Sequence, residues 1–391
     1  LLAEVGRKVS LTELDISHCD AVTAEGCSRL AGLRALKSLD ISGCKVTNAW
    51  LATLARLPAL ERLTLRMGAH VTDVDLAELA GGGEGGGRGS NSGSGDSGTA
   101  AAGLSAATAG MAAAGATATG LTGTLRHLCL SGCAEVTDAG LACLVPLRQL
   151  TSLDLSNLPR VTDAGVAALC ARLPALQSLS VAGNPTVGNR TFQAAAHGCR
   201  GLTELDAHGT SADERGLQML RGMPALQRLQ LPRQGRGLGA EAVRHLAAIP
   251  ALTALDLAGL GTKLAAALMP ADLAPLAALG RLQTLSLCGV TAATDDALAA
   301  LLPALPRLQQ LDLNGAPCSS AAAMAGLSSL HDLGLAFTAF ADDALEGLAA
   351  VPALTALTLR GCRGVGSRGL PYLGRLQHLR TLNLMGTDAA E

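Results

Sequence analysis

The pattern Leu-x-x-Leu-x-Leu, with polar residues at many of the intervening positions, recurs along the 391-residue chain. Alternation of apolar and polar residues predicts a short β-strand with one buried side and one exposed side. Fourteen copies occur, most of them 24 to 26 residues apart, with single steps of 22, 30 and 65 residues. The copies, some of which end in Ile, Val or Ala, begin at Leu11, Leu36, Leu60, Leu125, Leu150, Leu176, Leu202, Leu226, Leu252, Leu282, Leu308, Leu330, Leu354 and Leu379.

The segment after each strand has apolar residues at helical spacing, as in "TDAGVAALCARLPAL" from Thr162 to Leu176. Thr162 or Asp163 is placed to cap such a helix. One strand and one helix cannot bury their apolar sides alone, whereas stacked copies can. The pattern resembles the leucine-rich repeat family across essentially the whole chain. This resemblance implies an α/β solenoid of about 14 repeats, a curved horseshoe with parallel strands on its concave face and helices on its convex face.

The step of 65 residues contains a tract of Gly, Ser, Ala and Thr at 81–120. Such a tract cannot bury enough surface to offset its ordering entropy, so we expect a disordered insertion. The predicted organisation is therefore repeats 1–3 at 1–80, the insertion at 81–120, and repeats 4–14 at 121–391. Within the insertion, "GDSG" resembles the nucleophile segment of trypsin-like serine proteases. Four residues in a low-complexity tract give Ser97 no catalytic role, and "GGGEGGGRG" lacks the context of a phosphate loop.

Composition narrows the class of protein. Aromatic residues make up 1% of the chain, so Leu, Ala and Val must fill the core. The net charge of −2 provides no basic field for nucleic acid or an anionic membrane. No apolar run is long enough for a transmembrane helix. Eleven cysteines without a signal peptide predict free thiols in an intracellular compartment: the cytoplasm, or alternatively the nucleus or a ciliary axoneme. We also expect sequence upstream of Leu1, because the first residues resemble the end of a helix.

Four cysteines occupy one repeat position, three residues past the last strand Leu or Ile: Cys19, Cys44, Cys133 and Cys362. We call this the ladder position. In many leucine-rich repeats an Asn there bonds the backbone of the turn, as Asn184 is expected to do. A small buried thiol would replace it with a weaker S–H bond. After residue 200 the ladder position is held by Thr210, Gln234, Leu260, Val290, Ala316 and Thr338.

The segment that follows the ladder position reads "VTDAGL" at Val136, "VTDAGV" at Val161, "VTDVDL" at Val71 and "VTAEGC" at Val22. Together with the ladder cysteines, it resembles the cysteine-containing subclass of leucine-rich repeats. That subclass is best known from F-box proteins, the substrate receptors of SCF-type ubiquitin ligases. The match is good in five or six repeats and fades after residue 200.

Five of the remaining seven cysteines fall into two groups. Cys143, Cys170 and Cys199 lie in helical segments and are expected in the core. Cys129 and Cys288 are expected at outward strand positions as accessible thiols, without an identifiable base. No Cys-x-x-Cys pair indicates zinc. We predict no metal, cofactor or catalytic site.

The outward residues between the strand leucines are the best candidates for binding. Six of them are Asp, which on strands about 4.8 Å apart would form an acidic stripe. They are either ordinary solvated residues of this fold or a surface for a basic segment of a partner. Arg233 and several other arginines interrupt a purely acidic face, and Phe337 is almost its only aromatic. The candidate partner-binding residues are Asp15, Asp40, Arg62, Arg66, His127, Cys129, Asp154, Asp206, His208, Arg228, Asp256, Asp312 and Arg360.

The sequence therefore predicts a non-enzymatic array for protein recognition. The resemblance implies the substrate-binding part of an SCF-type receptor, with an F-box outside this sequence that binds a Skp-type adaptor. The alternatives are a scaffold or regulatory protein of the cytoskeleton or axoneme, and a GTPase-activating protein of the Ran type, for which no specific residues are present. The last strand pattern is not followed by a polar capping helix, so we also expect sequence beyond Glu391.

Overall fold

The computed structural model describes residues 10–19, 22, 24–45, 48–81, 121–231, 239–258 and 268–390. The chain divides into two compact units, unit 1 at Leu1–Leu202 and unit 2 at Thr203–Glu391. The expected insertion lies outside the described residues from position 82 onward. Ser97, Arg233, Gln234 and Leu260 also lie outside them.

The described strands of unit 1 pair in sequence order and are all parallel. In every pair the central leucines stand opposite each other, as Leu63 does with Leu128 on either side of the expected insertion. The strands are β1 (Glu13–Asp15), β2 (Ser38–Asp40), β3 (Arg62–Thr64), β4 (His127–Cys129), β5 (Ser152–Asp154) and β6 (Ser178–Ser180).

Unit 2 repeats this arrangement, with its described strands parallel and in register. They are β7 (Glu204–Asp206), β8 (Arg228–Gln230), β9 (Ala254–Asp256), β10 (Thr284–Ser286), β11 (Gln310–Asp312), β12 (Asp332–Gly334), β13 (Ala356–Thr358) and β14 (Thr381–Asn383).

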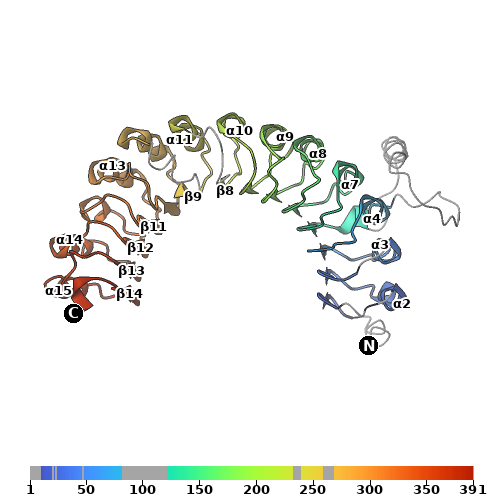
Figure 1. Ribbon diagram of the computed structural model, residues 1–391, viewed down its shortest axis with the longest axis horizontal. Helices are drawn as coiled ribbons and strands as arrows, with labels where there is room; N and C mark the ends of the chain where they lie inside the picture. The colour runs from blue at the N-terminus through green and yellow to red at the C-terminus, as the bar shows by residue number, and fades with distance from the viewer. Residues whose placement is uncertain are drawn as a thin grey trace. The chain divides into compact units, whose positions relative to one another are not determined.

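In each unit the strands line one side and short helices line the other (Figure 1). The helices of unit 1 are α2 (Ala24–Ser28), η1 (Arg29–Gly32), α3 (Asn48–Leu54), α4 (Asp73–Leu79), α6 (Leu121–Thr124), α7 (Asp138–Cys143), α8 (Asp163–Cys170) and α9 (Asn189–Gly198). Those of unit 2 are α10 (Glu214–Met219), α11 (Ala240–Ala247), η3 (Pro270–Ala278), α13 (Asp295–Leu301), η4 (Leu302–Ala304), η5 (Ala322–Met324), α14 (Asp342–Leu348), α15 (Leu370–Leu373) and η6 (Asp388–Ala390). The predicted leucine-rich repeat architecture, with parallel strands opposite helices, is confirmed. No helix in the described ranges is both long and apolar enough to cross a bilayer.

The core of each unit is built from the predicted leucines. The central leucine is buried in each strand from β2 to β6 and from β7 to β13. Leu14 of β1 and Leu382 of β14 are more exposed, because each of these strands has a described neighbour on one side only.

On the helix side of unit 1, the Asp of the Val-Thr-Asp motif joins one repeat to the next. The Asp138 carboxylate accepts hydrogen bonds from the backbone N–H and the hydroxyl of Thr162, at 2.8 and 2.5 Å. Asp73 accepts the same two bonds from Thr137, again at 2.8 and 2.5 Å. Each Thr is the N-cap residue of its helix, so the carboxylate stabilises the start of the helix in the following repeat.

Thr162, one of the two residues predicted to cap α8, holds the N-cap position of this helix. The side chain of Thr162 makes no capping bond within its own helix. The Asp163 carboxylate instead accepts the backbone N–H and the hydroxyl of Thr191 in the next repeat, at 2.9 and 2.7 Å. The spacing along the sequence favoured a local bond, but the stacking brings the neighbouring repeat within reach.

The glycine of the same motif makes room for this carboxylate. A Cβ added to Gly165 would overlap the carboxylate of Asp138, and one added to Gly140 would overlap that of Asp73. The Val-Thr-Asp-x-Gly segment is therefore explained by contact between repeats.

Replacing Gly165 with Ala should lower the free energy of unfolding by about 1–3 kcal/mol, because the new methyl group meets the Asp138 carboxylate. The cost should shrink when Asp138 is already Ala, since the two changes act on one contact. Urea denaturation of both single variants and the double variant measures this coupling. Gly280→Ala is the control, because a Cβ there meets nothing within 4 Å. Equal costs of Gly165→Ala in both backgrounds would contradict the account.

Candidate partner-binding surface

The first and third residues of each strand point away from the core, and we call this side of each unit the strand face. The third residues stand in register, as the pairs Asp15 with Asp40 and Ser286 with Asp312 illustrate. In unit 1 the third residues are Asp15, Asp40, Thr64, Cys129, Asp154 and Ser180. In unit 2 they are Asp206, Gln230, Asp256, Ser286, Asp312, Gly334, Thr358 and Asn383.

The aspartates of the strand face also build the turns that follow the strands. In each case one carboxylate oxygen accepts the backbone N–H two residues later, which is an Asx turn. For Asp40 the donor is Ser42 at 2.8 Å, and Asn383 makes the same bond to Met385 at 3.0 Å. The other members are Asp15, Asp154, Asp206, Asp256 and Asp312. The fold alone therefore accounts for an Asp or Asn here, although it does not require the charge.

The strand face of unit 1 contains a polar cluster around Cys129. The Arg66 Nε–H donates to the Cys129 sulfur at 3.3 Å, and the thiol donates to Asp154 Oδ2 at 3.2 Å. Arg66 also lies 3.9 Å from the same carboxylate oxygen. Burial raises the pKa of the Cys129 thiol, and Arg66 only partly opposes this. Half-buried Cys129 is thus held as a thiol, which does not suit a nucleophile.

Two other predicted residues of unit 1 lie at its first strand positions. Exposed Arg62 donates to Glu13 at 3.0 Å. His127 lies beside it with its side chain largely exposed, and partial burial followed by the charge of Arg62 lowers the pKa of its imidazole.

In unit 2 the predicted residues spread along the strand face. Arg228 lies 3.9 Å from Glu204 on the neighbouring strand. His208 lies in the turn after β7, where its backbone N–H donates to Asp206 at 3.1 Å. Arg360 lies after β13, with its guanidinium 5.6 Å from the centroid of the Phe337 ring.

Cys288 lies in the turn after β10, two residues past the outward strand position that the sequence predicted. It is half-exposed. Burial and then the charges of Asp312 and Asp256 raise the pKa of its thiol. Asp256 and Asp312, on the strands either side of β10, are therefore close enough for their charges to affect the Cys288 thiol.

The ladder position is an interior hydrogen-bonding position. The thiols of Cys44, Cys133 and Cys362 donate to strand-end carbonyls of the preceding repeat at 3.1, 3.1 and 3.0 Å. Asn184 donates from its amide nitrogen to Leu155 O at 2.8 Å, also in the preceding repeat.

The predicted burial of Cys19 was wrong, because this side chain is exposed. The preceding repeat supplies the cover at the ladder position, and Cys19 belongs to the first described repeat. Cys143, Cys170 and Cys199 are buried as predicted, and all eleven cysteines are free thiols. Within the described ranges, no three His, Cys, Asp or Glu side chains are grouped to hold a metal ion.

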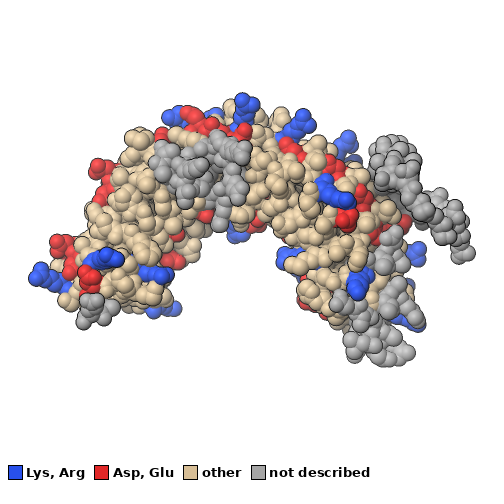
Figure 2. Space-filling model, in the orientation of Figure 1, with Lys and Arg blue, Asp and Glu red and all other residues tan. Residues whose placement is uncertain are grey.

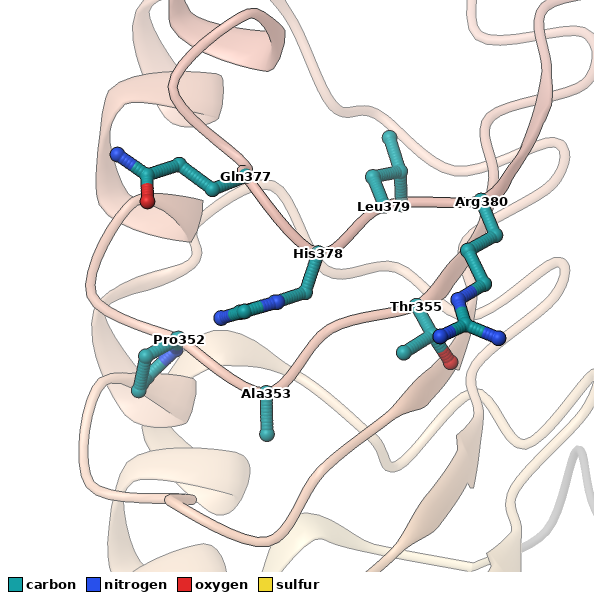
Figure 3. A pocket seen from close by; sticks show the side chains of 7 residues that line it. All are labelled: Pro352, Ala353, Thr355, Gln377, His378, Leu379 and Arg380. Atoms are coloured by element: carbon teal, nitrogen blue, oxygen red, sulfur yellow. The ribbon is translucent and has the colours of Figure 1, made fainter.

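Sequence reasoning missed one pocket in unit 2, of 560 Å³, where the segments before β13 and β14 run side by side (Figure 3). His378 extends over Pro352 and Ala353, while Thr355 and Arg380 lie nearer the strands. The Thr355 hydroxyl already donates to His331 O at 2.9 Å. The pocket is lined by two segments that are separate in the sequence, so no local motif indicated it.

Figure 2 shows acidic and basic side chains interspersed over the visible helices of each unit, without a continuous field of either sign. A specific charge pattern must therefore come from smaller groups of residues, such as the aspartates of the strand face.

Parallel in-register strands, buried central leucines and opposing helices define a leucine-rich repeat fold in each unit. A family model described as Leucine Rich repeat matches residues 8–31 and 124–145. No curated protein matches the chain. At the identities found among solved structures, the likeness shows the fold alone.

One similar structure is an internalin (inlF) from Listeria monocytogenes, with 17% identity and a TM-score of 0.63 over 98% of this chain and 93% of that one. Another is a leucine-rich repeat protein from Leptospira interrogans, with 14% identity and a TM-score of 0.52 over 99% and 93%. A third is the Rad7 and Elc1 complex of yeast, with 17% identity and a TM-score of 0.50 over 92% and 78%.

Replacing Asp256 and Asp312 with Asn should make Cys288 react faster with iodoacetamide at pH 8. The carboxylates raise the pKa of the thiol, so removing their charges lowers it and increases the thiolate fraction. We expect the rate at this pH to increase in step with the larger thiolate fraction. Mass spectrometry of the alkylated peptide gives the rate. Asp206→Asn, on β7, is the matched control, and an unchanged rate in the double variant would contradict the predicted effect.

Proposed function

We propose that the strand face of each unit binds a segment of a protein partner, and that the chain recognises substrates for SCF-dependent ubiquitination and proteasomal degradation. The observation that carries the binding role is the row of Asp206, Asp256 and Asp312 on alternate strands of unit 2. We call these three residues the acidic row.

The spacing of the acidic row fits a basic segment. Alternate strands lie about 9.6 Å apart, twice the spacing between neighbours. An extended peptide advances about 3.3 Å per residue, so every third residue recurs after about 10 Å. A partner that crosses the strands with Lys or Arg at every third position therefore places one cation near each carboxylate.

Two observations support the ubiquitin-related part of the proposal. The ladder thiols and the Val-Thr-Asp-x-Gly contacts give a physical basis for the resemblance to F-box receptors. One structure similar in fold is a complex of two proteins, Rad7 and Elc1, which supports a protein partner in general. In this proposal the strand face holds the target, and an F-box outside these residues binds the Skp-type adaptor. A scaffold of the cytoskeleton or axoneme is the alternative, and it uses the same strand face without the adaptor.

A synthetic 12-residue peptide with Lys at every third position should bind the chain, and changing all three residues of the acidic row to Asn should weaken it about tenfold. The slope of affinity against salt should also become flatter. Asn is chosen because Asn383 makes the same turn bond, so the change removes charge and keeps the turn. Fluorescence anisotropy at several salt concentrations measures both effects.

The control for this test carries the same change of charge on the helices, with Asp296→Asn, Asp343→Asn and Glu346→Gln. It should bind the Lys peptide as the unmodified chain does. Equal weakening in both variants would show that net charge, not the acidic row, attracts the peptide.

The ubiquitin-related role is tested on the full-length protein in its own cells. Affinity purification followed by mass spectrometry should recover a Skp-type adaptor and a cullin. The variant of the acidic row should still recover both, because the adaptor is expected to bind elsewhere. Absence of adaptor and cullin from the unmodified protein would remove the ligase role and leave the scaffold alternative.

A further inference from the structure

One turn position after the strands has a left-handed backbone in both units. In unit 2 it is held by Gly315, Gly361 and Gly386, with φ of 70°, 72° and 75°. Phe337 holds the same position with φ of 58°. This conformation is unfavourable for a bulky side chain, because its Cβ crowds the backbone. Glycine would make the turn with less strain, so the turn does not explain Phe337.

The ring of Phe337 lies against the next repeat. A Cβ added to Gly361 would come within 2.5 Å of ring atoms Cδ1 and Cε1, so the ring covers this glycine. The Arg360 guanidinium lies 5.6 Å from the ring centroid, in the range of a cation–π contact. The Phe337 N–H also donates to Arg360 O at 2.7 Å. A ring fixed in this way loses little conformational freedom when a partner binds it.

Phe337 is 63% exposed in a chain that has only five aromatic residues. Trp50, Phe192 and Phe340 are fully buried, and Tyr372 is half-buried. Aromatic and Arg side chains are the residues most often found as anchors of protein interfaces. Phe337 and Arg360 form such a pair on the surface.

Thr358, the third residue of β13, lies on the strand face beside this pair. On β12 the same position is Gly334, where a Cβ would come within 3.0–3.1 Å of the Asp312 carboxylate and the Asn314 amide, so these two side chains border the glycine. Met385, 57% exposed, holds the position of Arg360 in the next repeat. We call Gly334, Phe337, Thr358, Arg360 and Met385 the Phe337 surface.

The chain segment that supplies Arg360 and Met385 is rich in arginine, although the Asp312 carboxylate borders Gly334. Residues 351–391 contain five arginines and two acidic residues, Asp388 and Glu391. In the described part of the chain, Arg360 contacts Phe337 and pairs with no carboxylate. The acidic row ends at Asp312. Asp332, the exposed first residue of β12, lies about 13 Å along the strand from the level of Arg360.

We propose that the Phe337 surface binds an extended segment of a protein partner in which an apolar side chain lies next to Asp or Glu. The apolar side chain packs on Phe337 and Met385, and the carboxylate pairs with Arg360. This inference rests on the proposed role of the strand face, and it assigns the end of unit 2 a partner chemistry opposite to that of the acidic row.

The test is a selection of random 12-residue peptides, displayed on phage, against the full chain. Enriched peptides should carry an apolar residue next to Asp or Glu. Synthetic copies should bind Phe337→Gly about tenfold or more weakly, and Arg360→Gln several-fold more weakly. Met67→Gly is the matched control, because exposed Met67 holds the same turn position in unit 1 with φ of 54°. It should not change the binding.

Thermal unfolding separates binding from folding. Phe337→Gly should keep the Tm of the unmodified chain within about 2 °C, because glycine suits this backbone. If this variant unfolds, Phe337→Asn replaces it, since Asn157 already adopts φ of 57° at the same position. Enrichment of basic peptides alone, with none that carry an apolar residue next to Asp or Glu, overturns the Phe337 surface, and so does equal binding of the acidic peptides to Phe337→Gly. If the enriched peptides lose affinity only for the variant of the acidic row, the Phe337 surface is overturned and the proposed function of the strand face stands. If no peptide is enriched, or if no strand-face variant weakens binding, both proposals fail.

Discussion

Contact between neighbouring repeats is the interaction on which each unit depends. A strand of three residues and a short helix have no core of their own, so the central leucines are buried only by the repeats on either side. The polar groups follow the same rule. On the helix side the Asp138 carboxylate bonds Thr162 of the next repeat, and in the interior the Cys133 thiol bonds Leu65 O of the preceding one. These contacts occupy the helix side and the interior, which leaves the strand face as the regular surface open to a partner, although its aspartates also close turns.

The period of the sequence was sufficient to predict the strands, their order and their buried leucines, because a stack of repeats is fixed by contacts between nearest neighbours. The ladder position could be found in the same way, since it lies at a constant distance from each strand. The error at Cys19 has the same cause. Its position in the repeat matched that of Cys44, but burial depends on a preceding repeat, which the described residues before Cys19 do not provide.

The hydrogen-bond partners of the polar side chains could not be predicted from the sequence. Asp163, one of two residues placed to cap its own helix, instead bonds Thr191 in the next repeat. The strand-face aspartates were predicted to point outward, yet their second role, closing the turn after the strand, depends on the backbone of that turn. Phe337 was noted as an aromatic residue, but its importance depends on its φ and on the ring over Gly361. The alignment of repeats contained one usable signal, because most of them have Gly where Phe337 stands.

A residue points to a partner most clearly when the fold gives no other reason for it. Asp40 closes a turn, and Asn383 shows that a neutral side chain does the same, so the charge alone remains to be explained at such positions. Phe337 is a different case, because its backbone is strained, its ring is exposed, and glycine serves the neighbouring turns. The acidic row therefore depends on its spacing across several strands, whereas Phe337 stands on its own geometry. A partner that bound both the acidic row and the Phe337 surface would need a basic stretch followed by an acidic and apolar one. This order across the strands would fix the direction in which the segment binds.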